Sequence, residues 1–225
     1  MACRELKRRP EAQSLLEQAV EIQTAHFGRH DPVTHNARSL LGQVLFDQAR
    51  QAREETRTDE AIALMRRAID HLREAAPDSA YLATAAYELG CLWRPAGCWK
   101  DTEASLVEAL KIAVTPELHA LRISALCELA ASLRERGREA EAAGRFAEAE
   151  DLRRQELGPD HWLVGVLIIE QGLTWEKARK LKLAIELLEK ALTIYSAHFG
   201  ADHAATNGVR DHLNCLVKKS KRWFW

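Results

Sequence analysis

Histidine and cysteine are the residue types in this sequence that are most able to bind a metal or to act in acid–base or redox chemistry. The chain has nine histidines and five cysteines among 225 residues. Two histidine pairs, His26 with His30 and His198 with His203, are closely spaced, but no cysteine or carboxylate cluster joins them at zinc-ligand spacing. The sequence has no CxxC pair, no phosphate-binding glycine-rich loop and no nucleophile elbow. We therefore expect no metal, no cofactor and no enzymatic activity.

The overall composition excludes several other classes of function. With 32 basic and 33 acidic residues the formal net charge is −1, so no overall field favours nucleic acid or anionic lipid. No stretch approaches about 18 uninterrupted apolar residues, and the N-terminus lacks the apolar segment of a signal peptide. An odd number of scattered cysteines is typical of a reducing compartment. We expect a cytoplasmic, mostly helical protein without a membrane span and without a nucleic-acid partner.

The paired histidines belong to a break that recurs along the chain. Gly28, Gly158 and Gly200 are each followed within three residues by an aspartate and a histidine, as in "GPDH" and "GADH". Weaker versions of the break fall at Ala76 and Thr115. Successive breaks are then 48, 39, 43 and 42 residues apart in the sequence. A period near 40 is typical of stacked helical hairpins.

The residues of the break have a structural explanation. A glycine at the end of a helix adopts the left-handed conformation that closes the last turn. The aspartate that follows, Asp31, Asp160 or Asp202, then caps the next helix by accepting its free N–H groups. Each break is therefore predicted to be a loop between two helices, and His161 and His203 need no chemistry to explain them.

A second regularity lies between the breaks. The first helix of each predicted hairpin carries a small residue followed three positions later by a large one. The small residues are Gly42, Gly90, Ala130 and Gly172. The second helix carries two small residues seven apart: Ala12/Ala19, Ala61/Ala68, Thr102/Ala109, Ala142/Ala149 and Ala184/Ala191. Small residues at helical spacing let two helices approach closely, and large ones fill the space between neighbouring hairpins.

These patterns predict an all-α fold, a right-handed α-solenoid of stacked antiparallel helical hairpins. A hairpin alone cannot bury its apolar face, so stability requires stacking. We expect a single solenoid over residues 1–225 with about ten helices. Its expected parts are an unpaired helix at 10–27, hairpins at about 31–75, 78–114, 117–157 and 160–199, and a final helix at 203–222. The segment 47–61 is about seven residues longer than its counterparts, which predicts that both helices of that hairpin are extended.

The two regularities together resemble the tetratricopeptide repeat. The period near 42 residues with "LGPDH" is similar to the kinesin-light-chain-like subclass of that repeat. The resemblance covers nearly the whole chain. It implies a non-catalytic scaffold or adaptor for protein–protein interaction, in which the first helices line a concave groove that receives a peptide or a helix. Alternatives are a regulatory module whose shape responds to a bound peptide, or a solenoid fragment that self-assembles.

The side chains predicted to face this groove lie off the packed stripe of each first helix. Two residues before the small residue the sequence has Glu88, Glu128 and Glu170, and four residues after it Arg94 and Arg134. Tyr87 and Phe46 complete the candidate binding residues. Such a row of glutamates favours a protein or peptide partner with a basic segment. The alternative is a solvated face that the neighbouring arginines partly neutralise.

The two ends of the chain carry incomplete repeats. The sequence begins with a second helix that lacks its first and ends with a first helix that lacks its second. We expect either a piece of a longer array, or terminal helices that act as caps or associate with another copy. The basic segment before Trp223, Phe224 and Trp225 could insert at a membrane interface or dock on a partner, but packing on the last helix is the favoured interpretation.

Overall fold

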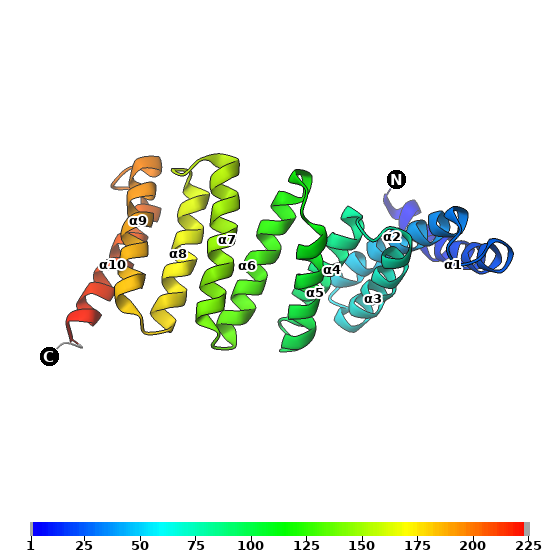
Figure 1. The fold of residues 1–225 in the computed structure, drawn as a ribbon, viewed down its shortest axis with the longest axis horizontal. Helices are drawn as coiled ribbons and strands as arrows, with labels where there is room; N and C mark the ends of the chain where they lie inside the picture. Colours follow the sequence, from blue (N-terminus) through cyan, green and yellow to red (C-terminus); the bar gives the residue numbers. More distant parts are fainter. Residues whose placement is uncertain (1, 223–225) are drawn as a thin grey trace. The chain divides into compact units, whose positions relative to one another are not determined.

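The computed structural model describes the backbone of residues 2–222 and the side chains of residues 11–221. Within that part the chain forms ten α-helices and one short 3-10 helix, and it has no strand (Figure 1). The predicted fold class, all-α with antiparallel helical hairpins, is confirmed. The predicted roles of Trp223, Phe224 and Trp225 lie outside the described residues.

The chain divides into two compact units, Met1–Leu121 and Arg122–Trp225. The boundary falls within α6. The helices are α1 (Ala2–Phe27), α2 (Pro32–Glu54), α3 (Thr58–Ala75), α4 (Ala80–Trp93), α5 (Trp99–Ile112), η1 (Pro116–Leu118), α6 (His119–Glu135), α7 (Glu139–Leu157), α8 (Trp162–Lys177), α9 (Leu181–Phe199) and α10 (Ala204–Arg222). First helices of hairpins have even numbers and second helices have odd numbers. That all of them form one continuous solenoid stays a prediction.

The loops between hairpins differ in detail from the predicted ones. Gly28, Gly158 and Gly200 have φ of 89°, 88° and 93°. Positive φ was predicted, but ψ is 160° at Gly158 and 159° at Gly200, which is an extended mirror-image conformation open almost only to glycine and not the left-handed helical one. In two of these loops a threonine fixes the glycine, because Thr34 donates to the Gly28 carbonyl and Thr206 to the Gly200 carbonyl.

The helix caps correct a second expectation. Asp31 accepts a hydrogen bond from the Val33 N–H at 2.8 Å, as predicted. At the other two breaks the histidine replaces the aspartate as the cap. Nδ1 of His161 accepts from the Leu163 N–H, and Nδ1 of His203 accepts from the Ala205 N–H, each at 3.2 Å. These histidines therefore have a structural role that the composition of the break alone did not assign.

The turns within the hairpins share a feature that the sequence analysis missed. Two residues before each complete second helix, one residue has positive φ: 61° at Thr56, 69° at Gly97, 74° at Gly137 and 58° at Arg179. Glycine adopts this conformation without steric cost, whereas threonine and arginine do so with strain. Gly97 and Gly137 occupy equivalent places in two hairpins, and this repeated glycine could have predicted the turn.

Packing within the hairpins follows the predicted pattern of small and large residues. The predicted small residues of the complete hairpins' second helices are fully buried, with 0% exposure for Ala61, Ala68, Ala142, Ala149, Ala184 and Ala191, whereas Ala12 and Ala19 of α1 are half-buried. A Cβ added at Gly42 would lie 2.6 Å from Leu72, and one at Gly90 would lie 2.7 Å from Leu106. At Gly172 the contact with Leu188 is looser, at 3.4 Å. Glycine therefore sets the approach of the two helices in the first two hairpins.

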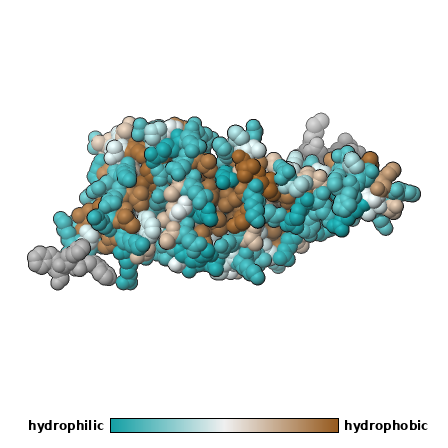
Figure 2. Space-filling view, in the orientation of Figure 1, coloured by the Kyte–Doolittle hydropathy of each residue, from teal (hydrophilic) through white to brown (hydrophobic). Residues whose placement is uncertain are grey.

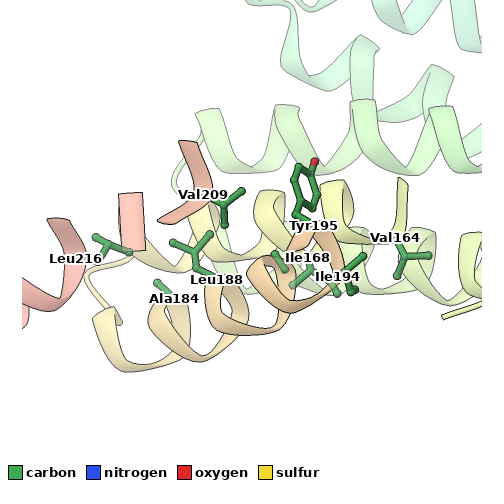
Figure 3. Close-up of a cluster of buried hydrophobic side chains, with 9 residues drawn as sticks. Val164, Ile168, Ala184, Leu188, Ile194, Tyr195, Val209 and Leu216 are labelled. Atoms are coloured by element: carbon green, nitrogen blue, oxygen red, sulfur yellow. The ribbon is translucent and has the colours of Figure 1, made fainter. Parts of the chain in front are cut away.

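The core of the second unit joins α8, α9 and α10. Figure 3 shows the buried side chains that these three helices contribute to one hydrophobic cluster: Val164, Ile168, Ala184, Leu188, Ile194, Tyr195, Val209 and Leu216. Burial of apolar surface of this kind stabilises the stack at roughly 25 cal/mol per Å². Outside the core, hydrophilic side chains cover much of the face seen in Figure 2, with hydrophobic patches between them.

The long hairpin is extended in one helix rather than in two. Helix α2 has 23 residues, against 14 in α4, 17 in α6 and 16 in α8. Helix α3 has 18 residues and is no longer than α7 or α9, which have 19 each. The extra residues of the segment 47–61 therefore lengthen α2, and its C-terminal part carries Arg50 and Arg53.

Candidate partner-binding surface

Glu88 of α4 is held by the extended end of α2. Its side chain is nearly buried, and the whole residue is 7% exposed. Nη1 of Arg53 lies 3.0 Å from Oε2 of Glu88, and Nε of Arg50 lies 3.4 Å from Oε1. Burial raises the pKa of Glu88, although Arg53 and Arg50 act in the opposite direction. The main contacts of the Glu88 carboxylate therefore link α4 to α2.

Glu170 of α8 forms the corresponding pair in the second unit. Its Oε2 lies 2.7 Å from Nη1 of Arg134 in α6, the preceding first helix. The side chains remain accessible, at 33% for Glu170 and 24% for Arg134. The Arg134 guanidinium also lies 5.5 Å from the centre of the Phe146 ring, a cation–π arrangement that fixes its orientation. Two residues that the sequence placed in neighbouring columns are therefore in contact.

A further contact joins α8 to α10. Here the acidic residue lies on the earlier helix and the basic residues on the later one, the reverse of Arg134 and Glu170. Glu176 of α8 lies 2.7 Å from Nε2 of His212 and 3.0 Å from Nζ of Lys219, both in α10. Burial opposes ionisation of Glu176, but hydrogen bonds from His212 and Lys219 outweigh it and lower the pKa of the carboxyl group. Charged side chains thus connect each first helix to the next along α6, α8 and α10.

The remaining candidate residues differ in how much surface they offer. Phe46 is 4% exposed, and its ring lies edge-on to Tyr81 with 6.1 Å between centroids. Tyr87, Arg94 and Glu128 are half-buried. The pair of Glu170 and Arg134 and the half-buried Glu128 therefore present more of the predicted surface to solvent than Glu88 or Phe46.

Three exposed apolar residues lie on first helices. Leu40 stands two residues before Gly42, in the predicted groove-facing column of Glu88, Glu128 and Glu170, whereas sequence reasoning did not single out Val33 and Tyr81. Val33 is 46% exposed, Leu40 53% and Tyr81 45%. Val33 and Tyr81 occupy equivalent places near the starts of α2 and α4, nine residues before Gly42 and Gly90 respectively. This repeated apolar residue was the signal that could have identified them.

The residues suited to chemistry remain apart from one another. Among the residues that the structure describes, no group of three or more histidine, cysteine, aspartate or glutamate side chains could hold a metal ion. The four described cysteines, Cys91, Cys98, Cys127 and Cys215, are free thiols. Burial, with a smaller effect of Glu170, raises the pKa of Cys127 to about 11, so this thiol stays protonated at neutral pH. No helix in the described part is long and apolar enough to cross a membrane.

The class of protein follows from this geometry together with the sequence comparison. Residues 122–163 and 172–205 match the family described as tetratricopeptide repeat. The matched segments cover α6 to α9, where paired helices, small-residue contacts and inter-helix ion pairs recur. Most of the segment from α6 to α9 is therefore built from tetratricopeptide repeats, and proteins built from such stacked repeats commonly act as interaction scaffolds.

Several solved structures have a similar fold. The crystal structure of the nearly identical TPR-like repeats of a putative kinesin light chain from Podosopora anserina has a TM-score of 0.56 and 18% identity, covering 87% of this chain and 90% of that one. BtubC (BKLC) from P. vanneervenii has a TM-score of 0.57 and 18% identity, with 95% and 90% covered. Both likenesses support the predicted fold of antiparallel helical hairpins.

A third similar structure is that of MamA protein, with a TM-score of 0.57 and 13% identity, covering 87% of this chain and 98% of that one. At these identities the likeness concerns the fold alone. No curated protein matched the sequence.

Proposed function

We propose that this protein is a non-catalytic scaffold or adaptor that binds a peptide or helix of a partner protein on its first helices. The contact between Arg134 and Glu170 is the observation that carries the proposal, because it brings two predicted groove residues together on α6 and α8 at 2.7 Å. Both side chains keep partial exposure, so the pair can exchange part of its mutual interaction for contacts with a partner.

The charge of this surface favours a partner with a basic segment. Glu128 and Glu170 lie 42 residues apart in the sequence, one repeat length, at equivalent places on α6 and α8. A lysine or arginine of the partner would form charge-assisted hydrogen bonds with these carboxylates. Glu88 contributes less to this proposal because Arg50 and Arg53 already neutralise it in a nearly buried position.

The test is a quantitative pulldown from cell lysate read by mass spectrometry. We would compare the wild type with the double variant Glu128→Lys/Glu170→Lys and with Glu148→Lys as a matched control. Glu148 is exposed on the second helix α7, and its ion pair with Arg145 lies within that helix. The ion pairs of Glu170 and Glu148 are partly exposed, and such pairs contribute up to about 1 kcal/mol each. Circular dichroism would verify that all three proteins are folded, because Glu128 is half-buried.

The proposal predicts proteins that the wild type and Glu148→Lys capture equally and that the double variant loses. If the double variant and the wild type capture the same proteins in the same amounts, the proposed surface on α6 and α8 is not where partners bind.

A further inference from the structure

Helices α1 and α9 have closely similar sequences although they lie in different units. Residues 12–28 and 184–200 align without gaps and are identical at ten of 17 positions. In the numbering of α1 the identical residues are Ala12, Leu15, Leu16, Glu17, Ala19, Ile22, Ala25, His26, Phe27 and Gly28. Both segments are second helices of hairpins that end at a glycine, so α9 shows what α1 is built to contact.

In α9 the shared residues pack against the first helix α8. A Cβ added at Gly172 would lie 3.4 Å from Leu188, and one at Gly165 would lie 2.7 Å from the Tyr195 ring and 3.4 Å from Ile194. These two glycines, seven residues apart, are the small residues that let α8 approach α9. Next to them, the rings of Trp162 and Phe199 lie with their centres 6.0 Å apart.

In α1 the same side chains are open to solvent. Ile22 is 58% exposed where its counterpart Ile194 is 9% exposed. Leu15 is 66% exposed and Phe27 is 60% exposed. Ala12 and Ala19 are half-buried, whereas Ala184 and Ala191 have 0% exposure. We call Ala12, Leu15, Ala19, Ile22 and Phe27 the open face of α1. Within the described residues α1 packs mainly against α2, and Leu15, Ile22 and Phe27 of this face remain exposed.

One edge of the open face carries an acidic residue. Among residues 11–27, whose side chains the structure describes, the charged residues are Glu11, Glu17 and Glu21, and there is no lysine or arginine. Glu11 is exposed and lies next to Ile22 in helical projection, while Glu21 lies on the opposite side of α1 and Glu17 pairs with Arg67 of α3 at 2.6 Å. The basic residues at positions 4, 7, 8 and 9 precede Ala12. Each complete second helix begins three residues before its first small residue, so nearly all of these basic residues fall before the part of α1 that corresponds to a second helix.

We propose that the open face of α1 binds an amphipathic helix of a partner protein in the way that α9 binds α8. The partner helix would carry two small residues seven apart on its apolar face, as Gly165 and Gly172 do, with lysine or arginine along its edges. The small residues would allow close approach to α1 near Ala12 and Ile22, the counterparts of the α9 residues that meet Gly172 and Gly165, and a basic residue would pair with Glu11. This surface is distinct from the one on α6 and α8, so the inference goes beyond the proposed function.

The test uses a peptide with the sequence of residues 161–178, which contains α8, with two lysines added at each end for charge and solubility. Binding to the full chain would be followed by fluorescence anisotropy. A control peptide would replace both glycines by leucine. The chain variant is Ile22→Glu on the open face, and its matched control is Val114→Glu, which changes an apolar residue of similar exposure, 62%, after α5. Both substituted positions are exposed, so both variants should keep the fold.

We expect the wild type and Val114→Glu to bind the peptide with equal affinity. Binding should weaken about tenfold or more in Ile22→Glu and with the leucine peptide, because a buried charge or a steric clash removes the close contact. Equal binding by Ile22→Glu, as would occur if the peptide displaced α8 from α9, overturns the proposal. Absence of binding to the wild type also overturns it, and a concentration-dependent mass that Ile22→Glu abolishes would then assign the open face to a second copy.

Discussion

Oε2 of Glu88 lies 3.0 Å from Nη1 of Arg53, and this contact joins α4 to the last part of α2. It exists because α2 is longer than α4, α6 and α8, and the additional C-terminal part of α2 carries Arg50 and Arg53. Of the two partners, Glu88 is the buried one, with 9% side-chain exposure against 39% for Arg53. The electrostatic cost of the pair therefore falls mainly on the carboxylate.

Replacing this carboxylate by an amide should change the pH dependence of stability. Because burial raises the pKa of Glu88, the folded chain takes up a proton there more readily than the unfolded chain. The contribution of Glu88 to the free energy of unfolding therefore rises as the pH falls from neutral toward the ordinary glutamate value of 4.5. At pH 7 we expect the free energy of unfolding of Glu88→Gln to equal that of the wild type or to exceed it by up to about 1 kcal/mol. This excess should shrink toward pH 5, because the wild type gains stability as Glu88 takes up a proton.

Urea titrations at several pH values would measure this difference. Glu17→Gln is the control of opposite sign, because hydrogen bonds from Gln13 and Arg67 lower the pKa of Glu17. That substitution should lower stability at pH 7, and the loss should diminish as the pH falls through and below the ordinary glutamate value. A Glu88→Gln variant that is several kcal/mol less stable at pH 7 would show that the ion pair outweighs burial.

The contact between Gly90 and Leu106 predicts a steric effect of one methyl group. In Gly90→Ala the new Cβ would lie 2.7 Å from Cγ of the fully buried Leu106, so we expect a loss of about 1–2 kcal/mol. Gly144→Ala is the matched control on α7, because it is exposed and its Cβ would meet nothing within 4 Å. It should gain roughly 0.5–1 kcal/mol from helix propensity. Equal effects of the two substitutions in urea unfolding would contradict close packing at Gly90.

The left-handed turn residue predicts a stabilising substitution. Thr56 has φ of 61°, where Gly97 and Gly137 fill the same place in the next two hairpins. Thr56→Gly removes strain of about 1–2 kcal/mol, offset by the greater entropy of glycine in the unfolded chain, so we expect a net gain of about 0.5 kcal/mol. Gly137→Thr should destabilise by about 1 kcal/mol. Thermal unfolding of the two variants would test the pair, and a shift of both melting temperatures in the same direction would refute the assignment.

The histidine cap of α8 predicts a loss that asparagine restores. His161→Ala removes the acceptor for the Leu163 N–H and should cost about 0.5–2 kcal/mol. His161→Asn keeps an acceptor at the cap position and should retain most of the stability. Free energies of unfolding from urea titrations distinguish the two variants. If both lose the same amount, the ring packing of His161 on Trp162 is the important contact rather than the cap.

The sequence predicted the hairpins well because their packing depends on side-chain size at fixed spacing. The pairs of small residues and the glycines of the first helices are local patterns, and the structure buries them as expected. The choice between Asp160 and His161 as the cap was not predictable in this way. Either side chain could accept the bond, and the backbone geometry after Gly158 decides which one reaches the Leu163 N–H.

The candidate surface was less predictable than the fold. A column of glutamates can be read from repeat spacing, but its exposure depends on what the preceding helix brings. Arg50 and Arg53 cover Glu88 because α2 alone is extended, whereas Glu170 meets the single Arg134. Trp93 and Trp175, which the repeat pattern placed in the core, are half-buried, with Arg66 and Lys180 lying over their rings. The exposure of these side chains therefore depends on which long basic side chains of neighbouring helices lie over them, and residue type alone does not predict that.

The central claim, that partners bind on the first helices, is tested most directly by site-specific photo-crosslinking in cells. A photoreactive phenylalanine analogue would replace Glu128 on α6 in one variant and Glu148 on α7 in another. Partners crosslinked through position 128 and absent at position 148 are the predicted result. Crosslinks of equal yield and identity at both positions, or crosslinks only at position 148, would contradict the proposed surface.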